Sequence, residues 1–205
     1  MRGTFLWSLI VCLMWFSYSP APVDAQTKKK AEVDRYVLAA LEKDYPGAII
    51  SKYLSTEACG SLKKTHPGWV TADFNGDGLT DHAVLINVQS KEEPTGMGKG
   101  YDFNLVVVWQ EKPGVYRTEL LSKIQENFIY GSPPNFSPPT IKQRITTGIY
   151  IDKQPPGKIQ ESAAVGDRTV TLQNPGIEFV YCEKSSVVYY WDRKANRFEE
   201  LVTSD

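Results

Sequence analysis

The chain has 205 residues, of which 41% are apolar and 23% are charged, and this composition excludes a chain that is disordered throughout. The 23 Lys and Arg residues nearly balance the 24 Asp and Glu residues, and the formal net charge is −1. A near-neutral chain gives no electrostatic reason to expect nucleic acid or an anionic membrane surface as a partner. We expect residues 26–205 to form a single domain, because this length suits one hydrophobic core better than two.

Residues 1–25 have the pattern of a secretory signal peptide. Arg2 is followed by an apolar run from Phe5 to Phe16, and Val23-Asp24-Ala25 precedes Gln26. As a helix this run would span about 18 Å, which is short of the ~30 Å hydrocarbon core of a bilayer. We therefore expect cleavage near Ala25/Gln26 and a secreted or periplasmic protein, with no transmembrane segment after signal cleavage. The alternatives are an uncleaved membrane anchor and a lipoprotein modified at Cys12.

Two cysteines remain once the signal peptide is removed, Cys59 and Cys182. Two thiols in an oxidising compartment favour one disulfide bond. In the chain-entropy treatment, closing a loop of this length stabilises the fold by up to ~4.7 kcal/mol. The alternative is a pair of separate buried thiols.

The predicted elements begin with one amphipathic helix and continue as strands. From Ala31 the apolar residues recur at intervals of three and four, as far as Leu41, and Pro46-Gly47 ends the helix. A long loop is expected at residues 91–100, and an extended Pro-rich loop at residues 131–139. We expect strands at residues 48–54, 69–72, 82–88, 103–109, 115–121, 145–151, 168–172, 177–181, 187–191 and 198–202.

The strands at residues 82–88 and 103–109 are apolar on both faces, which is typical of central strands. The later strands are short and separated by tight turns, as in a meander. Together these elements predict the α+β class, with one N-terminal amphipathic helix packed on a mainly antiparallel β-sheet.

The segment with the clearest chemistry is the D-x-N-x-D-G-x-x-D run between the strands at residues 69–72 and 82–88. A hard cation such as Ca²⁺ takes six to eight oxygen ligands, so a short loop must curl around it. Gly78 permits the sharp bend. The expected oxygen donors are the side chains of Asp73, Asn75 and Asp77, the backbone carbonyl of Leu79, and Asp81 either directly or through water.

This run resembles the calcium loops of the FG-GAP/VCBS type, in which DFNGDGxxD recurs between β-strands. It is also similar to the dockerin calcium loop, although that loop leads into a helix. The resemblance implies calcium ligation by Asp73, Asn75, Asp77, Leu79 and Asp81, and it implies no catalysis. The run occurs once, whereas a propeller needs several copies. The chain also resembles exported bacterial proteins of an uncharacterised family. The shared features are a signal peptide, a helix ending in Pro-Gly, a single loop of this type and a YYW…F…D terminus.

The loop departs from an EF-hand at its twelfth position, where Val84 replaces the bidentate Glu. We therefore expect a weak structural Ca²⁺ site, with a Kd on the order of 10⁻⁴–10⁻³ M, that fixes the turn before a central strand. The alternative is a metal-free turn, in which the Asp and Asn side chains accept hydrogen bonds from backbone N–H groups.

No catalytic set emerges from the residues after the signal peptide. The two histidines are His66 and His82, and His82 follows Asp81 in a strand, where neighbouring side chains point to opposite faces. A Cys59–His66 nucleophile pair is less favoured than a disulfide. The Gly-rich run at residues 96–100 lacks the G-x-x-x-x-G-K-[ST] pattern of a phosphate loop. The aromatic residues near the C-terminus are expected to form core and cross-strand pairs.

These observations predict an exported, calcium-stabilised protein that binds an envelope or extracellular macromolecule without catalysing a reaction. The alternative is an extracellular or periplasmic hydrolase, acting on a glycan or a peptide, whose catalytic acids no motif identifies. A third interpretation is a purely structural envelope protein.

Overall fold

The structure is a computed structural model that describes residues 35–51, 53–54, 59, 68–89, 101–126, 146–182 and 184–204. Several sequence predictions lie wholly outside these residues. They are the signal peptide, the long loop at residues 91–100 with its Gly-rich run, and the Pro-rich loop at residues 131–139.

The predicted α+β class is wrong, because strands make up most of the described chain. The described helix covers only residues 35–44, and the strands form several antiparallel sheets instead of one. The physical reason is that the strands divide into two sheets that bury their apolar faces against each other. Most of the core is therefore built between sheets, and a helix is not needed to complete it.

The first sheet has five antiparallel strands, in the order β1-β4-β5-β6 with β3 also paired to β4. Its strands are β1 (Ile49–Ile50), β3 (Trp69–Ala72), β4 (Asp81–Gln89), β5 (Tyr101–Lys112) and β6 (Val115–Glu126). The central strands β4 and β5 are buried on both faces, as their continuous apolar runs predicted.

The second sheet has four antiparallel strands in the order β13-β12-β11-β8. Its strands are β8 (Ile149–Gln154), β11 (Gly176–Tyr181), β12 (Ser185–Asp192) and β13 (Arg197–Ser204). Two smaller pairs accompany the sheets: the antiparallel pair β9 (Gly157–Gln160) and β10 (Thr169–Leu172), and the short parallel pair β2 (Tyr53–Leu54) and β7 (Thr146–Thr147). Strand β9 was not predicted from the sequence.

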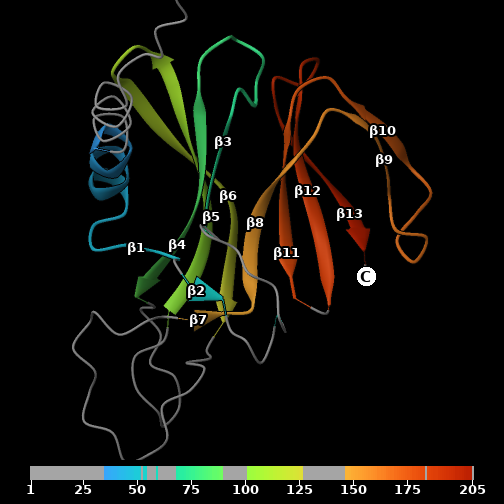
Figure 1. The fold of residues 1–205 in the computed structure, drawn as a ribbon, viewed down its shortest axis with the longest axis horizontal. Helices are drawn as coiled ribbons and strands as arrows, with labels where there is room; N and C mark the ends of the chain where they lie inside the picture. Colours follow the sequence, from blue (N-terminus) through green and yellow to red (C-terminus); the bar gives the residue numbers. More distant parts are fainter. Residues whose placement is uncertain are drawn as a thin grey trace, which may run out of the picture.

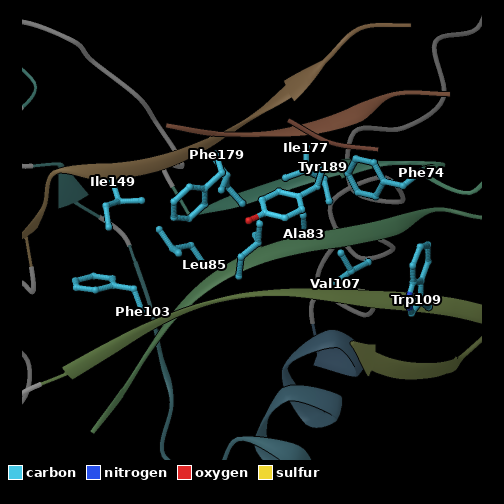
Figure 2. Close-up of a cluster of buried hydrophobic side chains, with 12 residues drawn as sticks. Phe74, Ala83, Leu85, Phe103, Val107, Trp109, Ile149, Ile177, Phe179 and Tyr189 are labelled. Carbon is cyan, nitrogen blue, oxygen red and sulfur yellow. The ribbon is translucent and has the colours of Figure 1, made fainter. Parts of the chain in front are cut away.

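The elements form four layers, seen from left to right in Figure 1 as the helix, the first sheet, the second sheet and the β9–β10 pair. The main core lies between the two sheets. Figure 2 shows Leu85, Val107 and Trp109 pointing from the first sheet toward Phe179 and Tyr189 of the second. Because side chains alternate along a strand, the neighbouring residues of β4 and β5 point to the opposite side.

The outer face of each sheet is covered by a smaller cluster. On the first sheet, Val37 and Leu41 of the helix are buried with Val84, Ile86 and Val106. On the second sheet, Ile159 of β9 and Leu172 of β10 are buried in a cluster with two residues of the sheet, Val188 and Leu201. Among the described residues, no helix is long and apolar enough to cross a membrane.

Candidate functional site

The predicted metal loop joins β3 to β4, two antiparallel strands that are in register from Trp69↔Val84 to Ala72↔Asp81. Two glycines in the loop have positive φ angles, +78° at Gly76 and +86° at Gly78. Residues with a Cβ are disfavoured in this conformation, so the glycines allow the tight reversal between the strands.

Asp73 organises the first half of the loop. Its Oδ1 atom accepts hydrogen bonds from the N–H groups of Gly76 at 2.6 Å and Asp77 at 3.1 Å, and its Oδ2 atom accepts one from Gly78 N–H at 2.8 Å. Three donors on one carboxylate pull the backbone into a closed turn around it.

Asn75 and Asp77 hold each other across the turn. Asn75 Oδ1 accepts a hydrogen bond from Asp77 N–H at 3.0 Å, and Asn75 Nδ2 donates one to Asp77 Oδ2 at 2.9 Å. Asp77 Oδ1 in turn accepts a hydrogen bond from Leu79 N–H at 2.8 Å. The three side chains Asp73, Asn75 and Asp77 therefore belong to one hydrogen-bonded group, in which Asp77 is exposed and the other two are half-buried.

Asp81 lies inside the protein at the start of β4 and is 0% exposed. Its Oδ2 atom accepts a hydrogen bond from Phe74 N–H at 3.1 Å, and its Oδ1 atom accepts one from Gln110 N–H of β5 at 3.2 Å. The carboxylate therefore connects the loop to the central strand of the first sheet.

Burial raises the pKa of Asp81 from 3.8 to about 6. The N–H donors of Gln110 and Phe74 oppose this rise, and the negative charges of Asp77 and Asp73 add to it. Asp81 is therefore close enough to these two acids to be influenced by their charge, although its own oxygens face inward.

The structure thus brings together Asp73, Asn75 and Asp77, and it turns Asp81 toward the core. The hydrogen bonds are those expected of an Asx-stabilised turn. Among the described residues, no three His, Cys, Asp or Glu side chains are gathered so that they could hold a metal ion. Any cation at this loop would depend on Asp73, Asn75 and Asp77 and on backbone oxygen.

Two residues that the sequence did not identify hold the loop against the second sheet. Asn174, in the turn between β10 and β11, donates from Nδ2 to the carbonyl of Phe74 at 3.3 Å. Arg193, in the turn between β12 and β13, donates from Nη2 to Asn174 Oδ1 at 3.1 Å. A Cβ at Gly76 would collide with Arg193 Nη2 and would lie 2.7 Å from the Asn174 amide. Both residues were predicted to lie in turns, but no local pattern connects those turns with a loop about 100 positions away.

His82 lies on the helix-facing side of β4 and is almost fully buried. Its Nδ1 atom accepts a hydrogen bond from Trp69 Nε1 at 3.2 Å, and its ring contacts Trp69 edge-on, with 5.7 Å between centroids. The Asp81 carboxylate is instead bound to backbone N–H groups. This agrees with the expectation that these neighbouring side chains point to different faces.

A cavity of about 310 Å³ lies beside the helix, over β1 and β4. Its lining is apolar except near one carboxylate and one phenol, and consists of Leu38, Ala39, Leu41, Glu42, Tyr45, Ala48, Ile50 and Ile86. Burial raises the pKa of the Tyr45 phenol, and the charge of Asp44 adds to the rise. The cavity therefore offers apolar contacts to a ligand. Its lining contains one carboxylate, that of Glu42, and not two that face each other.

The disulfide prediction is confirmed, since Cys59 and Cys182 are bonded with their Cα atoms 5.0 Å apart. A disulfide indicates an oxidising environment outside the cytoplasm. The bond fixes residue 59 to the end of β11 in the second sheet.

The longest edge of the first sheet is the outer side of β6. This strand ends the sheet order, and no strand of the described chain pairs with its outer side. Four large apolar side chains of the described residues are exposed, and two of them lie on β6: Val115 at 38% and Leu120 at 45%. An edge strand of this kind presents unpaired backbone N–H and C=O groups together with apolar side chains.

Comparisons of the chain with protein-family models, with curated proteins and with solved structures find no match.

Proposed function

We propose that this protein is an exported, non-catalytic binding domain that holds an extracellular or envelope protein by strand addition at β6. The observation that carries the proposal is the outer edge of β6, a 12-residue strand that bears exposed Val115 and Leu120. In strand addition, main-chain hydrogen bonds supply affinity and alternate side chains supply specificity.

Export is supported by the Cys59–Cys182 disulfide, together with the basic and apolar segment at residues 1–25 of the sequence. The proposed partner is therefore a protein met outside the cytoplasm.

Strand addition at β6 can be tested with a fluorescently labelled peptide that copies residues 115–123, by fluorescence anisotropy. We expect saturable binding to the oxidised full chain, and a loss of at least about tenfold in affinity in Leu120→Lys, because the added charge has to be desolvated at the edge. Val165→Lys is the matched control, since Val165 is 55% exposed and lies outside β6. Equal binding to all three proteins, or binding to none, would overturn the proposal.

The calcium part of the proposal concerns the stability of the loop at residues 73–81. It is supported by the grouping of Asp73, Asn75 and Asp77. It is also supported by the repulsion between Asp81 and the negative charges of Asp77 and Asp73, which contributes to the raised pKa of Asp81. A bound cation would relieve this repulsion, with oxygens of those three residues and of the Leu79 backbone as its ligands.

A thermal melt with calcium at about 10–100 mM, which is 100 times the expected Kd, and with chelator tests the calcium part. Calcium at 100 times its Kd should stabilise the folded protein by ~2.7 kcal/mol if the unfolded chain does not bind it. The response should disappear in Asp77→Ala, whereas Asp152→Ala, an acid on β8, should respond like the wild type. An unchanged wild-type melting temperature would contradict calcium binding and would leave the β6 proposal intact.

A further inference from the structure

We infer that the partner strand at β6 is the β6 of a second copy of this chain, so that two protomers form a two-fold symmetric dimer with one continuous sheet. This inference rests on the proposed function of β6 as a strand-addition edge. A two-fold interface requires a self-complementary surface, because each residue meets its counterpart through the same operation in both directions.

The charges of β6 satisfy this requirement when Thr118 lies on the two-fold axis. Antiparallel pairing in this register places Arg117 opposite Glu119 of the second copy, and Glu119 opposite Arg117 of the second copy. Two opposite-charge pairs therefore form at the centre, where like charges would destabilise the pairing.

Both charged groups are accessible at the edge, where Arg117 Nη1 already pairs with Glu119 Oε2 at 3.5 Å and Arg117 Nε pairs with Glu111 Oε1 at 3.1 Å. The pairs in the dimer would therefore extend an existing charge network. The Arg117 side chain is 49% exposed and lies over the ring of Trp109, 5.4 Å from its centroid. The Glu119 side chain is 33% exposed, and its Oε2 atom accepts a hydrogen bond from Trp109 Nε1 at 2.7 Å. The buried Trp109 thus holds both partners of the proposed charge pairs on one face of the strand.

The next pair in this register brings apolar groups together. Tyr116 lies opposite Leu120 of the second copy, on the face that carries the helix. Tyr116 is half-buried and stacks on Tyr36 of the helix, with 6.2 Å between ring centroids. Leu120 is 45% exposed in the single chain and Val115 is 38% exposed, so the pairing would cover the more exposed of these two residues.

The side chains of each pair also share a face, as antiparallel pairing demands. Arg117 and Glu119 are on the face toward the second sheet, since both contact Trp109 of the main core. Thr118 is on the opposite face, where its Oγ1 atom donates a hydrogen bond to Asp44 of the helix at 2.6 Å.

The bulge in β6 argues against a different register. Pairing with β5 passes from Val106↔Leu120 to Leu105↔Ser122, so that Leu121 has no counterpart. A dimer centred on Leu121 would pair Glu119 with Lys123, but its axis would pass through the irregular residue. The register centred on Thr118 keeps its four paired positions within the regular part of the strand.

Sedimentation of the oxidised full chain over a hundredfold range of concentration tests this inference. We expect a monomer–dimer equilibrium that Arg117→Glu and Glu119→Arg each shift at least about tenfold toward monomer, because each reversal places like charges opposite one another. Mixing the two variants should restore a dimer, because the acidic edge of one then meets the basic edge of the other. This recovery also excludes misfolding as the cause of the loss.

Two results would overturn the dimer: a wild-type chain that remains monomeric throughout the range, or a dimer that survives both charge reversals. The chain could instead be monomeric, with the labelled β6 peptide binding to the wild type and losing affinity for Leu120→Lys. In that case only the assignment of the partner fails, and strand addition stands. If neither the peptide nor a second copy binds, both proposals fail.

Discussion

Asp81 is a buried acid held by two backbone N–H groups, and its role is defined by what surrounds it. Burial favours the neutral form, whereas the donors from Phe74 and Gln110 favour the charged form. Burial prevails, so the pKa rises to about 6. At the same scale, Asn174 and Arg193 fix the loop by occupying the space beside Gly76.

The raised pKa of Asp81 predicts a pH dependence of stability. The folded-state pKa of about 6 lies above the ordinary aspartate value of 3.8, so the folded protein binds the proton more tightly than the unfolded chain. Asp81 therefore makes the free energy of unfolding fall as pH rises from about 4 to 6, by on the order of 3 kcal/mol. Urea unfolding at several pH values measures this as the difference between the wild type and Asp81→Asn. A difference that does not change across this range would contradict it.

Gly76→Ala and Gly78→Ala form a matched pair that tests the contact of the loop with Asn174 and Arg193. Both glycines have positive φ, so either substitution should cost about 1 kcal/mol in backbone strain. At Gly76 the new methyl group would also collide with Arg193 and Asn174, whereas nothing lies within 4 Å of a Cβ at Gly78. We expect Gly76→Ala to lose about 0.5–1.5 kcal/mol more than Gly78→Ala in chemical denaturation, because the flexible ends of Arg193 and Asn174 can move aside at the expense of their hydrogen bonds. Equal losses would mean that the contact does not constrain the loop.

At the scale of elements, the strands follow from alternation of apolar residues, which is a local property. Strands β4, β5, β6 and β10 to β13 lie where the sequence predicted them, with ends that differ by a few residues. The predicted strand at residues 145–151 is instead divided between β7 and β8, because Gly148 interrupts it. Strand β9 was missed because Gly157–Gln160 contains one apolar side chain, Ile159, which is also its one buried residue. Its sequence therefore shows no alternation of apolar and polar residues.

The helix offers a test of element packing in two leucines three positions apart. Leu41 is 4% exposed in a cluster with β4 and β5, whereas Leu38 is 47% exposed. Leu41→Ala should lower the free energy of unfolding by about 2–5 kcal/mol, and Leu38→Ala should change it by no more than about 0.5 kcal/mol. The two variants have the same helix propensity, so a small and equal effect in urea unfolding would mean that the helix does not stabilise the sheet.

At the scale of the whole molecule, two sheets pack face to face, and the chain is closed by one covalent link. The Cys59–Cys182 bond joins residues 123 positions apart and ties the first half of the chain to β11. Much of the stability of such a link comes from the conformations it removes from the unfolded chain, in the entropic treatment.

Removing the disulfide should therefore destabilise the whole fold. We expect the double variant Cys59→Ser/Cys182→Ser to lose about 4–5 kcal/mol, measured by chemical denaturation without reductant. Adding dithiothreitol should lower the stability of the wild type to a similar level and leave the double variant unchanged. A wild type that is insensitive to reduction would mean that the bond adds nothing to folding.

The sequence by itself determined the positions of most strands and the burial of both faces of β4 and β5, and it favoured a disulfide between Cys59 and Cys182 over two separate thiols. These features depend on local alternation, on continuous apolar runs, and on having two cysteines left to pair. Only the tertiary structure decided that the strands divide into two facing sheets, that Asp81 turns inward to Gln110, and that Arg193 and Asn174 brace the loop. Each of these depends on contacts between segments far apart in the chain, and residue spacing within one segment carries no information about which distant surface will cover it.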